Sequence, residues 1–595
     1  MPGITGFISK ADIQNQQPML ERMVGSMKHE PFYNTGTLLQ KEVGLGIGWV
    51  SHPGSFADCN PVWNEQRDIG LVFAGEHFGH FGSGPDARSL VALYEEKGEA
   101  FFEALNGVFS GVLIDRRQSK VVLFNDRYGL GRIYFHESAD GFYFASEAKA
   151  LLKVLPQTRR LDQAGFAEFF SCGCALQDRT LFDGISLLPG ASAWAFRRGE
   201  PVEKRTYFDR SVWEKQSELP TEEYYKKLNE TFTRILPRYF QSQQKVGLSL
   251  TGGLDSRMIM ANVEPGSGLP CHTFGGMYRE CADVRLAKEI ARVTKHAHEV
   301  IPVTGKLFGE FPDLARRSVY NTDGAMDVTG SVEMFVNRVA RGMSPVRLTG
   351  NYGSEILRGN VAFKNTTWND AVFAPDFAAQ VNAAAASYTQ ERKGSRTSFI
   401  AFKQVPWFHY ARMAVEASQL TVRSPYLDND LVAVAFQAPE SPLVNQMLAH
   451  RYIADHNADL GRIPTDRGVV GHNGAPRSKF AVFRQEFMPR VEYVFDYGMP
   501  QWLAKVDRVM APTHWERLFL GRQKFYHFRV WYRHELSAYV KEVLLDPRTL
   551  NRPYLNRRRV EEIVNAHVTG RGNHTLELHK LLSSELIQRH LIEQV

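Results

Sequence analysis

The strongest constraint on the fold of this chain is a short apolar run that ends in a Thr-Gly-Gly turn. Residues 246–250 read Val-Gly-Leu-Ser-Leu, the turn occupies 251–253, and an apolar-periodic segment begins at Ser256. This order predicts a buried strand, a tight turn, and a helix that is capped by Asp255 or Ser256. The two glycines carry no Cβ atoms, so backbone N–H groups can gather around an anion at the positive end of the helix.

The chemistry of the turn predicts a site for a polyphosphate. Thr251 and Ser256 place hydroxyl groups on either side of the glycines, and Asp255 supplies the hard oxygen ligand that a magnesium-bound polyphosphate needs. No lysine follows the glycines at the spacing of the Walker loop, so that class of nucleotide site is excluded. An ordinary strand–turn–helix corner is the alternative interpretation.

The composition narrows the class of protein. A chain of 595 residues, 43% hydrophobic and 23% charged, is typical of a soluble protein with two domains, or three as the alternative. The net charge is +6, and no dense Lys/Arg block argues for nucleic acid. The five cysteines are scattered, and no signal pattern or window of about 18 apolar residues occurs. We therefore expect a cytoplasmic protein that binds neither nucleic acid nor a membrane.

Strand-like segments separated by polar turns dominate the first third of the chain. Residues 1–8 read as an opening strand, 105–115 and 120–127 as a hairpin, and 141–152 as a strand that runs into a helix. The run Gly44-x-Gly46-x-Gly48 is interpreted as a Gly-rich strand, because no helix pattern follows it. We predict a layered sheet domain here.

A polar segment over 197–218 predicts a domain junction. Beyond it, apolar residues recur at helical spacing from Thr221 to Phe240. Strand patterns at 271–276 and 298–303 flank an amphipathic helix over 283–294, for which Asp283 is the predicted N-cap. Alternating strands and helices predict a parallel α/β sheet, with ligands at the carboxyl ends of its strands.

Residues 251–256, called the phosphate loop from here on, resemble the S-G-G-x-D-S signature of the PP-loop ATP pyrophosphatases, with Thr251 in place of the first serine. The N-terminal region resembles the class II glutamine amidotransferase domain of asparagine synthetases, through L-N-G-V-F-S-G at 105–111, N-D-R-Y-G-L-G-R-I-Y-F at 125–135 and F-A-S-E-A-K-A-L-L at 144–152. Together they resemble the asparagine synthetase superfamily. The resemblance implies an N-terminal αββα sandwich of the Ntn type over 1–205. It also implies a PP-loop synthetase domain over 220–595, α/β with a helical C-terminal part.

The amidotransferase chemistry of that family does not carry over. The family uses an N-terminal cysteine as nucleophile, whereas Pro2 follows Met1 here and has no nucleophilic side chain. The N-G-E motif of the oxyanion hole reads Ala74-Gly75-Glu76, which removes the amide donor of its asparagine. We interpret this region as an inactive glutaminase kept as scaffold. A glutaminase with another nucleophile, such as Cys59, is the alternative.

The second polar loop, at 349–359, follows an apolar strand and resembles two family patterns. Without a gap it matches S-G-E-G-S-D-E-x-x-G-G, and Ser354 then replaces the second metal-binding aspartate. With one inserted residue it matches the T-G-Y-G-x-D loop of β-lactam synthetases, which makes Glu355 the metal ligand and Tyr352 the acid/base residue. We prefer the second alignment, because magnesium ions that bridge ATP phosphates need a carboxylate here. The alternative is that Glu355 is a surface residue on a Gly-rich turn.

Two further segments resemble family motifs. Residues 421–428 match E-x-R-x-P-F-L-D from Arg423 onward. The acidic residue that opens the family segment is replaced by Thr421, and Glu416 is the candidate to supply the missing carboxylate. We expect Arg423 and Asp428 to hold each other and the adjoining helices. Arg477-Ser478-Lys479-Phe480 resembles the segment whose lysine stabilises negative charge on the α-phosphate, with Arg467 as a rival to Lys479.

The predicted site follows from these resemblances. Its catalytic residues are Lys479 and Tyr352, and its metal ligands are Asp255 and Glu355. The residues predicted to bind ATP and pyrophosphate are Leu250, Thr251, Gly252, Gly253, Leu254, Asp255, Ser256, Gly276, Thr349 and Gly350.

The resemblance implies an ATP-dependent, AMP-forming amide ligase with ATP and Mg²⁺ as cofactors. It would adenylate a small-molecule or peptide carboxylate and transfer the acyl group to an amine or ammonia without hydrolysing glutamine. β-Lactam synthetases and lasso-peptide cyclases share this logic, so we expect a role in specialised biosynthesis or peptide modification. The alternatives are an ammonia-dependent asparagine synthetase and a non-catalytic nucleotide-binding homologue. The sequence is also compatible with a homodimer.

Overall fold

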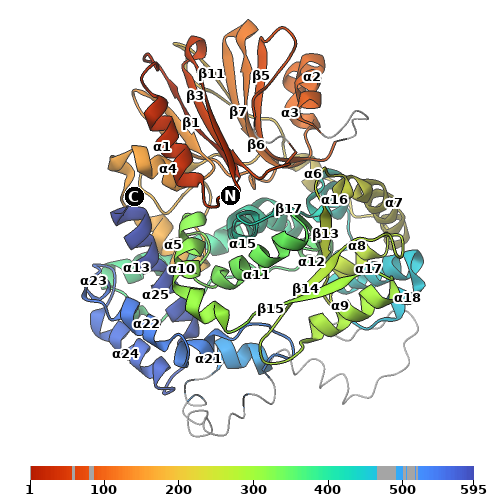
Figure 1. Ribbon diagram of the computed structural model, residues 1–595, viewed down its shortest axis with the longest axis vertical. Coiled ribbons are helices and arrows are strands. Elements are labelled where there is room, and N and C mark those ends of the chain that lie inside the picture. The colour runs from red at the N-terminus through yellow and green to blue at the C-terminus, as the bar shows by residue number, and fades with distance from the viewer. Residues whose placement is uncertain are drawn as a thin grey trace.

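The computed structural model describes residues 2–56, 60–79, 86–366, 368–465, 491–499, 501, 504, 516 and 520–594. They form an N-terminal part with antiparallel sheets and a larger part with a parallel sheet (Figure 1). The chain starts between the two parts, and it ends beside helix α4 (Ala148–Val154) of the first, which packs against α1 (Gln17–Met27) (Figure 1). The predicted fold class is confirmed.

Two six-stranded antiparallel sheets build the N-terminal part. The strands of the first sheet are, in spatial order, β10 (Ser186–Leu187), β8 (Tyr134–Glu137), β9 (Gly141–Ala145), β1 (Gly3–Ser9), β3 (Leu45–Ser51) and β2 (Asn34–Gln40). The strands of the second sheet are, in spatial order, β12 (Glu203–Thr206), β11 (Ser192–Arg197), β7 (Lys120–Asn125), β6 (Gly107–Asp115), β5 (Ile69–His77) and β4 (Val62–Trp63). The predicted hairpin is confirmed as β6–β7, and the Gly-rich run is confirmed as strand β3.

The two sheets pack face to face, and helices cover their outer faces. On β6, Val112 and Ile114 point into the core between the sheets, whereas Phe109 and Leu113 pack under helices of the second sheet. Successive side chains of a strand point to opposite faces, so a strand covered on both faces reads as a continuous apolar run. The covering helices are α1 and α4 on the first sheet, and α2 (Ala87–Lys97) and α3 (Phe101–Ala104) on the second.

A five-stranded parallel sheet forms the centre of the larger part. In spatial order its strands are β15 (His298–Pro302), β14 (Cys271–Gly275), β13 (Val246–Ser249), β16 (Val346–Thr349) and β17 (Thr421–Arg423). β13 and β16 are neighbours and end in register, with Ser249 opposite Thr349. The loops that follow these two strands therefore meet at one edge of the sheet, where ligands of such sheets bind.

Helices cover both faces of this sheet and continue to the end of the chain (Figure 1). The predicted helix over 221–240 is confirmed as α7, which buries Tyr224, Leu228 and Ile235 at helical spacing. The other helices are α5 (Gln163–Cys172), α6 (Ser211–Glu214), α8 (Leu254–Met260), α9 (Ala282–Val293), α10 (Lys306–Asn321), α11 (Gly330–Met343), α12 (Gly353–Arg358), α13 (Pro375–Glu391), α14 (Arg396–Phe399), a π-helix (Ile400–His409), α15 (Tyr410–Ala417), α16 (Asn429–Ala435), α17 (Pro442–His456), α18 (Ala458–Arg462), α21 (Phe528–Arg533), α22 (Ser537–Leu544), α23 (Pro547–Leu550), α24 (Arg557–Val568), α25 (Thr575–Ile587) and a final π-helical turn (Gln588–Glu593).

Two predicted helix caps are wrong. Helix α8 begins directly after Gly253, and no side chain caps it, so neither Asp255 nor Ser256 has that role. Helix α9 begins after Cys281, which places Asp283 in the first turn. The Asp283 carboxylate instead accepts a hydrogen bond from the N–H of Gly252 at 2.8 Å. The donor lies in the loop after β13 and the acceptor in the helix after the neighbouring strand β14, so this contact cannot be predicted from the local sequence around Asp283.

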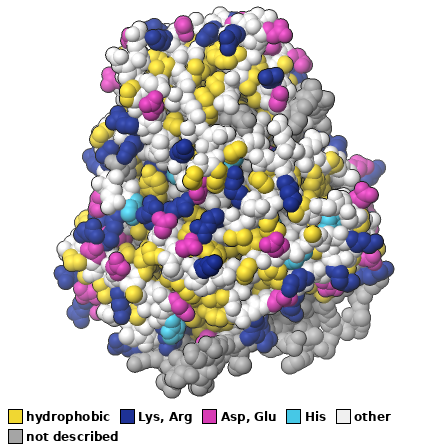
Figure 2. All heavy atoms as spheres, in the orientation of Figure 1, with side chains coloured by type: hydrophobic (Ala, Val, Ile, Leu, Met, Phe, Trp, Pro, Cys, Tyr) yellow, Lys and Arg dark blue, Asp and Glu magenta, His cyan; other side chains and the backbone are white. Residues whose placement is uncertain are grey.

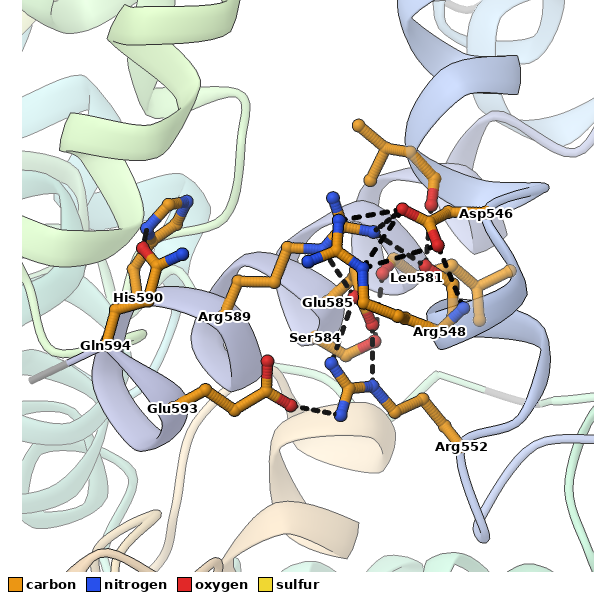
Figure 3. Close-up of polar contacts among 12 residues, drawn as sticks. Asp546, Arg548, Arg552, Leu581, Ser584, Glu585, Arg589, His590, Glu593 and Gln594 are labelled. Atoms are coloured by element: carbon orange, nitrogen blue, oxygen red, sulfur yellow. Dashed lines mark hydrogen bonds and ion pairs between the residues drawn. The ribbon is translucent and has the colours of Figure 1, made fainter.

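A network of ion pairs fastens the end of the chain (Figure 3). Arg589 lies 3.0 Å from Asp546 and 2.5 Å from Glu585. Arg552 lies 2.9 Å from Glu585 and 2.5 Å from Glu593. Glu585 is buried, so its charge is paired on two sides where water does not reach it. The network ties α25 and the final turn to the segment around α23.

Charged side chains of both signs are mixed on one face of the molecule. On the face drawn in Figure 2, Lys and Arg side chains are interspersed with Asp and Glu side chains. Within the described ranges, no helix is both long enough and apolar enough to cross a membrane.

Candidate nucleotide-binding site

The loop after β13 keeps its own N–H groups occupied with side-chain oxygens. The N–H of Thr251 donates to Ser256 Oγ at 3.1 Å, and the N–H of Gly253 donates to Thr251 Oγ1 at 3.2 Å. The N–H of Gly252 donates to the Asp283 carboxylate. Each of these oxygens is an acceptor of the kind that a phosphate supplies, so the loop is shaped to surround an anion.

The loop after β16 interlocks with the phosphate loop through two glycines. A Cβ atom on Gly350 would lie 2.6 Å from the backbone N of Ser256, and one on Gly353 would lie 2.5 Å from the Asp255 carboxylate. Such distances are too short for any side chain. Between these glycines Tyr352 has φ = 72°, a left-handed conformation that costs a bulky residue free energy. The close approach of the loops therefore holds the tyrosine in a strained backbone conformation.

The two loops line one cavity of about 380 Å³, a volume in the range of small-molecule sites. We call it the nucleotide cavity, after the ligand that the sequence predicts for it. The cavity brings together these predicted site residues: Leu250, Thr251, Asp255, Ser256, Thr349, Gly350, Tyr352 and Glu355. Gly276 lies just after β14, against the backbone of Phe525, which itself lines the cavity. Lys479 and its rival Arg467 lie outside the described residues.

The Tyr352 side chain is buried beside a second carboxylate. Burial raises its pKa, and the charges of Glu416 and Glu355 raise it further, so the phenol stays protonated at neutral pH. The amide of Asn351 donates to Glu416 at 3.4 Å, and the guanidinium of Arg412 donates to it at 3.1 Å. Glu416 therefore sits beside the tyrosine loop, although Thr421 holds the acidic position of the sequence motif.

Sequence reasoning missed His409, which lines the same cavity. Its Nε2 lies 3.7 Å from the Glu355 carboxylate, and its ring meets the Tyr352 ring edge-on at 5.8 Å. Burial lowers the pKa of His409 to about 4, and the charge of Arg412 adds to this effect. His409 ends a π-helix, a feature frequent at functional sites, but its aromatic-rich sequence carries no signal for one.

The geometry at Asp255 does not fit the predicted magnesium site. Both of its carboxylate oxygens accept hydrogen bonds from Arg358, at 2.7 and 2.8 Å. Glu355 accepts one from Ser354 at 2.8 Å, and burial raises its pKa. The part of the chain that the structure describes contains no group of three or more His, Cys, Asp or Glu side chains that could hold a metal ion.

A second cavity, of about 120 Å³, lies between the two parts of the molecule. Pro2, Ala74 and Gly75 of the N-terminal part line it, together with Tyr352 of the larger part. Cys59, the alternative nucleophile, lies outside the described residues. Tyr352 lines both this cavity and the cavity between the loops after β13 and β16.

The expected pairing of Arg423 with Asp428 is wrong. Arg423 instead forms a buried ion pair with Glu76 of the N-terminal part, at 2.5 Å. Asp428 accepts hydrogen bonds from Asn106, at 2.9 Å, and from Tyr239, at 3.2 Å. Both residues thus hold the two parts together, a contact that the spacing of a single segment cannot predict.

Comparisons with known proteins agree with this architecture. Residues 1–208 match the model of the glutamine amidotransferase domain, and residues 227–453 match that of asparagine synthase. The chain belongs to the asparagine synthetase superfamily. The N-terminal part and the parallel-sheet part of the fold correspond to these two matches, in the order that the superfamily resemblance implied.

Individual members of the superfamily are distant relatives. Asparagine synthetase [glutamine-hydrolyzing] 1 of Bacillus subtilis is 22% identical over 60% of this chain and 59% of its own length. Asparagine synthetase [glutamine-hydrolyzing] 2 of Oryza sativa is 24% identical over 68% of this chain and 61% of its own length. Asparagine synthetase [glutamine-hydrolyzing] 3 of B. subtilis is 28% identical over 33% of this chain and 32% of its own length. The chain thus spans at most about six tenths of these relatives.

Proposed function

We propose that this protein is an ATP-dependent, AMP-forming carbon–nitrogen ligase. The observation that carries the proposal is the cavity shared by the loops after β13 and β16, in a chain of the asparagine synthetase superfamily. The loop after β13 offers the hydroxyls of Thr251 and Ser256 to a polyphosphate, whose oxygens would replace side-chain oxygens as acceptors for the closely spaced N–H groups. The cavity also contains Arg347 and Arg412, whose charges would stabilise negative charge that grows on phosphate oxygens.

The proposed reaction has two steps. A substrate carboxylate oxygen forms a bond to the α-phosphorus of ATP, and the bond from that phosphorus to the bridging oxygen breaks as pyrophosphate leaves. The nitrogen of an amine then bonds to the acyl carbon, AMP leaves with the electrons of the broken C–O bond, and the nitrogen loses a proton. Tyr352 is protonated at neutral pH, which suits it to donate a hydrogen bond, with Glu416 beside its loop. Mg²⁺ and Lys479 remain predictions.

We further propose that the nitrogen does not come from glutamine. Pro2 and Ala74 stand where the amidotransferase family has its nucleophile and its amide donor. The described lining of the 120 Å³ cavity at this place contains Pro2, Ala74 and Gly75 and no cysteine. Free ammonia or an amine carried by a substrate is then the acceptor, which supports a role in specialised biosynthesis or peptide modification. Ammonia-dependent asparagine synthesis is the alternative within the same chemistry.

The test is exchange of labelled pyrophosphate into ATP across a panel of acids: aspartate, β-amino acids and carboxylate-bearing peptides. The variant is Gly350→Ala, which pushes the two loops apart. The matched control is Gly342→Ala, because Gly342 is an exposed helical glycine whose Cβ would meet open space. We expect exchange with one acid in the wild type and the control, and a loss of at least about 100-fold in Gly350→Ala.

The same panel decides between the proposal and a non-catalytic nucleotide-binding homologue. The pairing of Asp255 with Arg358 favours that second candidate, since it ties up a carboxylate of the loop. ATP binding without exchange on any acid would support the homologue and overturn the ligase.

A further inference from the structure

Arg358 ends helix α12 and points its guanidinium at the first turn of α8. Its two terminal nitrogens lie 2.7 and 2.8 Å from the two carboxylate oxygens of Asp255. The side chains are only 11% and 17% exposed, respectively. A two-point ion pair between a planar guanidinium and a carboxylate is the strongest and most directional kind that proteins form.

Surrounding contacts fix this pair in place. The hydroxyl of Tyr426 donates to the backbone carbonyl of Asp255 at 2.7 Å, and Gly353 packs directly against its carboxylate. Burial opposes the charge of Arg358, but the Asp255 carboxylate outweighs it and raises the pKa of the guanidinium. The pair is therefore a built part of the site rather than a loose surface contact.

The pair changes what an incoming polyphosphate meets. Without Arg358, the Asp255 carboxylate would be a half-buried negative charge in the lining of the cavity and would repel phosphate oxygens. With Arg358, its charge is already neutralised by the protein. A divalent cation that bound Asp255 would first have to displace the guanidinium from both oxygens.

The sequence of the loop explains why this chain has such a pair. In the ungapped register of S-G-E-G-S-D-E-x-x-G-G, Arg358 stands at the first glycine of the closing pair. A glycine at this position has no side chain with which to reach Asp255. Of the two predicted metal ligands, Glu355 accepts a hydrogen bond from Ser354 and has no two-point arginine partner within the described ranges, so it is the one left for a cation that accompanies the nucleotide.

We propose that Arg358 takes the place of a metal ion at Asp255, so that polyphosphate binds the loop with little dependence on a divalent cation at this carboxylate. The inference rests on the proposed function, because it assumes that ATP binds this cavity. Its chemistry makes Arg358 a positioning residue that acts on ATP through Asp255. If Arg358 had only a structural role, replacing it would not change how strongly ATP binding depends on Mg²⁺. A change in that dependence therefore identifies the positioning role.

The experiment is calorimetric titration of the full-length protein with ATP, once in EDTA and once in excess Mg²⁺. We expect the wild type to bind ATP in both, with affinities within about tenfold of each other. In Arg358→Gln the uncovered carboxylate should weaken binding in EDTA by about tenfold or more, and Mg²⁺ should restore most of the loss. Arg358→Lys keeps the positive charge but not the two-point geometry, so its ATP affinity in EDTA should lie between those of the wild type and Arg358→Gln. The matched control is Arg234→Gln, which removes an exposed pair with Asp430.

A second readout uses Mn²⁺ without nucleotide, followed by electron paramagnetic resonance. Arg358→Gln should bind one more Mn²⁺ ion than the wild type, and Asp255→Asn in the same chain should remove that site. Equal Mn²⁺ binding by the wild type and Arg358→Gln would overturn the inference.

The failures of the two proposals are distinguishable. If the wild type binds ATP only with Mg²⁺ while pyrophosphate exchange proceeds, the inference falls and the ligase stands. If the wild type binds no ATP in either medium, both proposals fall. The comparison of EDTA with Mg²⁺ in the wild type decides the matter even if Arg358→Gln does not fold.

Discussion

Two carboxylates from family motifs are held by arginines in this protein, and the two pairs do different things. Glu76, from the altered amidotransferase motif, is bound to Arg423 across the boundary between the two parts. Asp255, from the phosphate loop, is bound to Arg358 within the larger part. Both residues of the first pair line the small cavity next to Pro2, whereas in the second pair Asp255 lines the larger nucleotide cavity and Arg358 lies behind it.

The difference lies in what surrounds each pair. Near Glu76 the motif has lost its asparagine to Ala74, and what remains serves contact between the two parts. Near Asp255 the hydroxyls of Thr251 and Ser256 and the adjacent N–H groups remain in a cavity that a nucleotide could enter. A retained motif residue is therefore evidence of function only when the donors around it are retained as well. Three changes test this contrast.

The largest effect is expected at the first pair. Arg423→Ala leaves the Glu76 carboxylate buried without its partner, which should lower the free energy of unfolding by about 3–5 kcal/mol. Urea denaturation measures the loss. Arg234→Ala, which breaks the exposed pair with Asp430 at 2.9 Å, should cost less than about 1 kcal/mol. Equal losses in the two variants would mean that the Glu76 pair does not hold the parts together.

An effect on activity with little effect on stability is expected at the phosphate loop. Ser256→Ala removes the oxygen that accepts the Thr251 N–H and a hydroxyl that faces the cavity. We expect pyrophosphate exchange to fall by about 100-fold, the effect of removing one hydrogen-bond donor to a developing negative charge. Ser387→Ala, on α13, removes a hydroxyl that donates an exposed hydrogen bond to the carbonyl of Ala383 in the same helix, and it should leave exchange unchanged. Exchange that survives in Ser256→Ala would exclude the loop from the reaction.

The smallest effect is expected from acid. Burial holds the pKa of His409 near 4, below the usual value of 6.5, so the unfolded chain takes up a proton over this range that the folded protein does not. Stability should therefore fall as the pH drops from 6.5 to 4, by about 1.4 kcal/mol per pH unit for this histidine. Urea denaturation at pH 7 and pH 5 should show a drop that is smaller by about 2 kcal/mol in His409→Gln than in the wild type.

The control for the acid effect is His136→Gln, on β8, where the ring contacts a backbone carbonyl at 2.7 Å outside both cavities. A drop in His409→Gln as large as in the wild type would show that His409 is not held neutral by the nucleotide cavity.

Local patterns predicted most of the fold. The apolar spacing over 221–240 gave the bounds of α7, and alternating strands and helices indicated the parallel sheet, because both depend on residues close in sequence. That the loops after β13 and β16 meet was implied by the family resemblance, which placed Asp255 and Glu355 in one site. The structure brings these loops together because the two strands are neighbours and end in register.

The partners of charged side chains could not be predicted in this way. Asp283 bonds Gly252 instead of capping its helix, and Arg423 reaches Glu76, which is 347 residues away. The ungapped register of the loop marks the position of Arg358 as altered, but neither its partner nor the place of His409 could be predicted, because each contact forms only where α12 or the π-helix meets another element. Ion pairs of this kind are products of tertiary packing and have no period in the sequence.

The last helices of the chain carry a consequence for how this protein could have been assembled. One hydrophobic core contains Leu151 and Phe166 from the N-terminal part, and Leu582 and Ile587 from α25, the helix anchored by the ion pairs in Figure 3. A gene that lost the codons for the N-terminal part would therefore encode a protein with an open apolar face. The N-terminal part covers this face, a role that does not depend on glutamine.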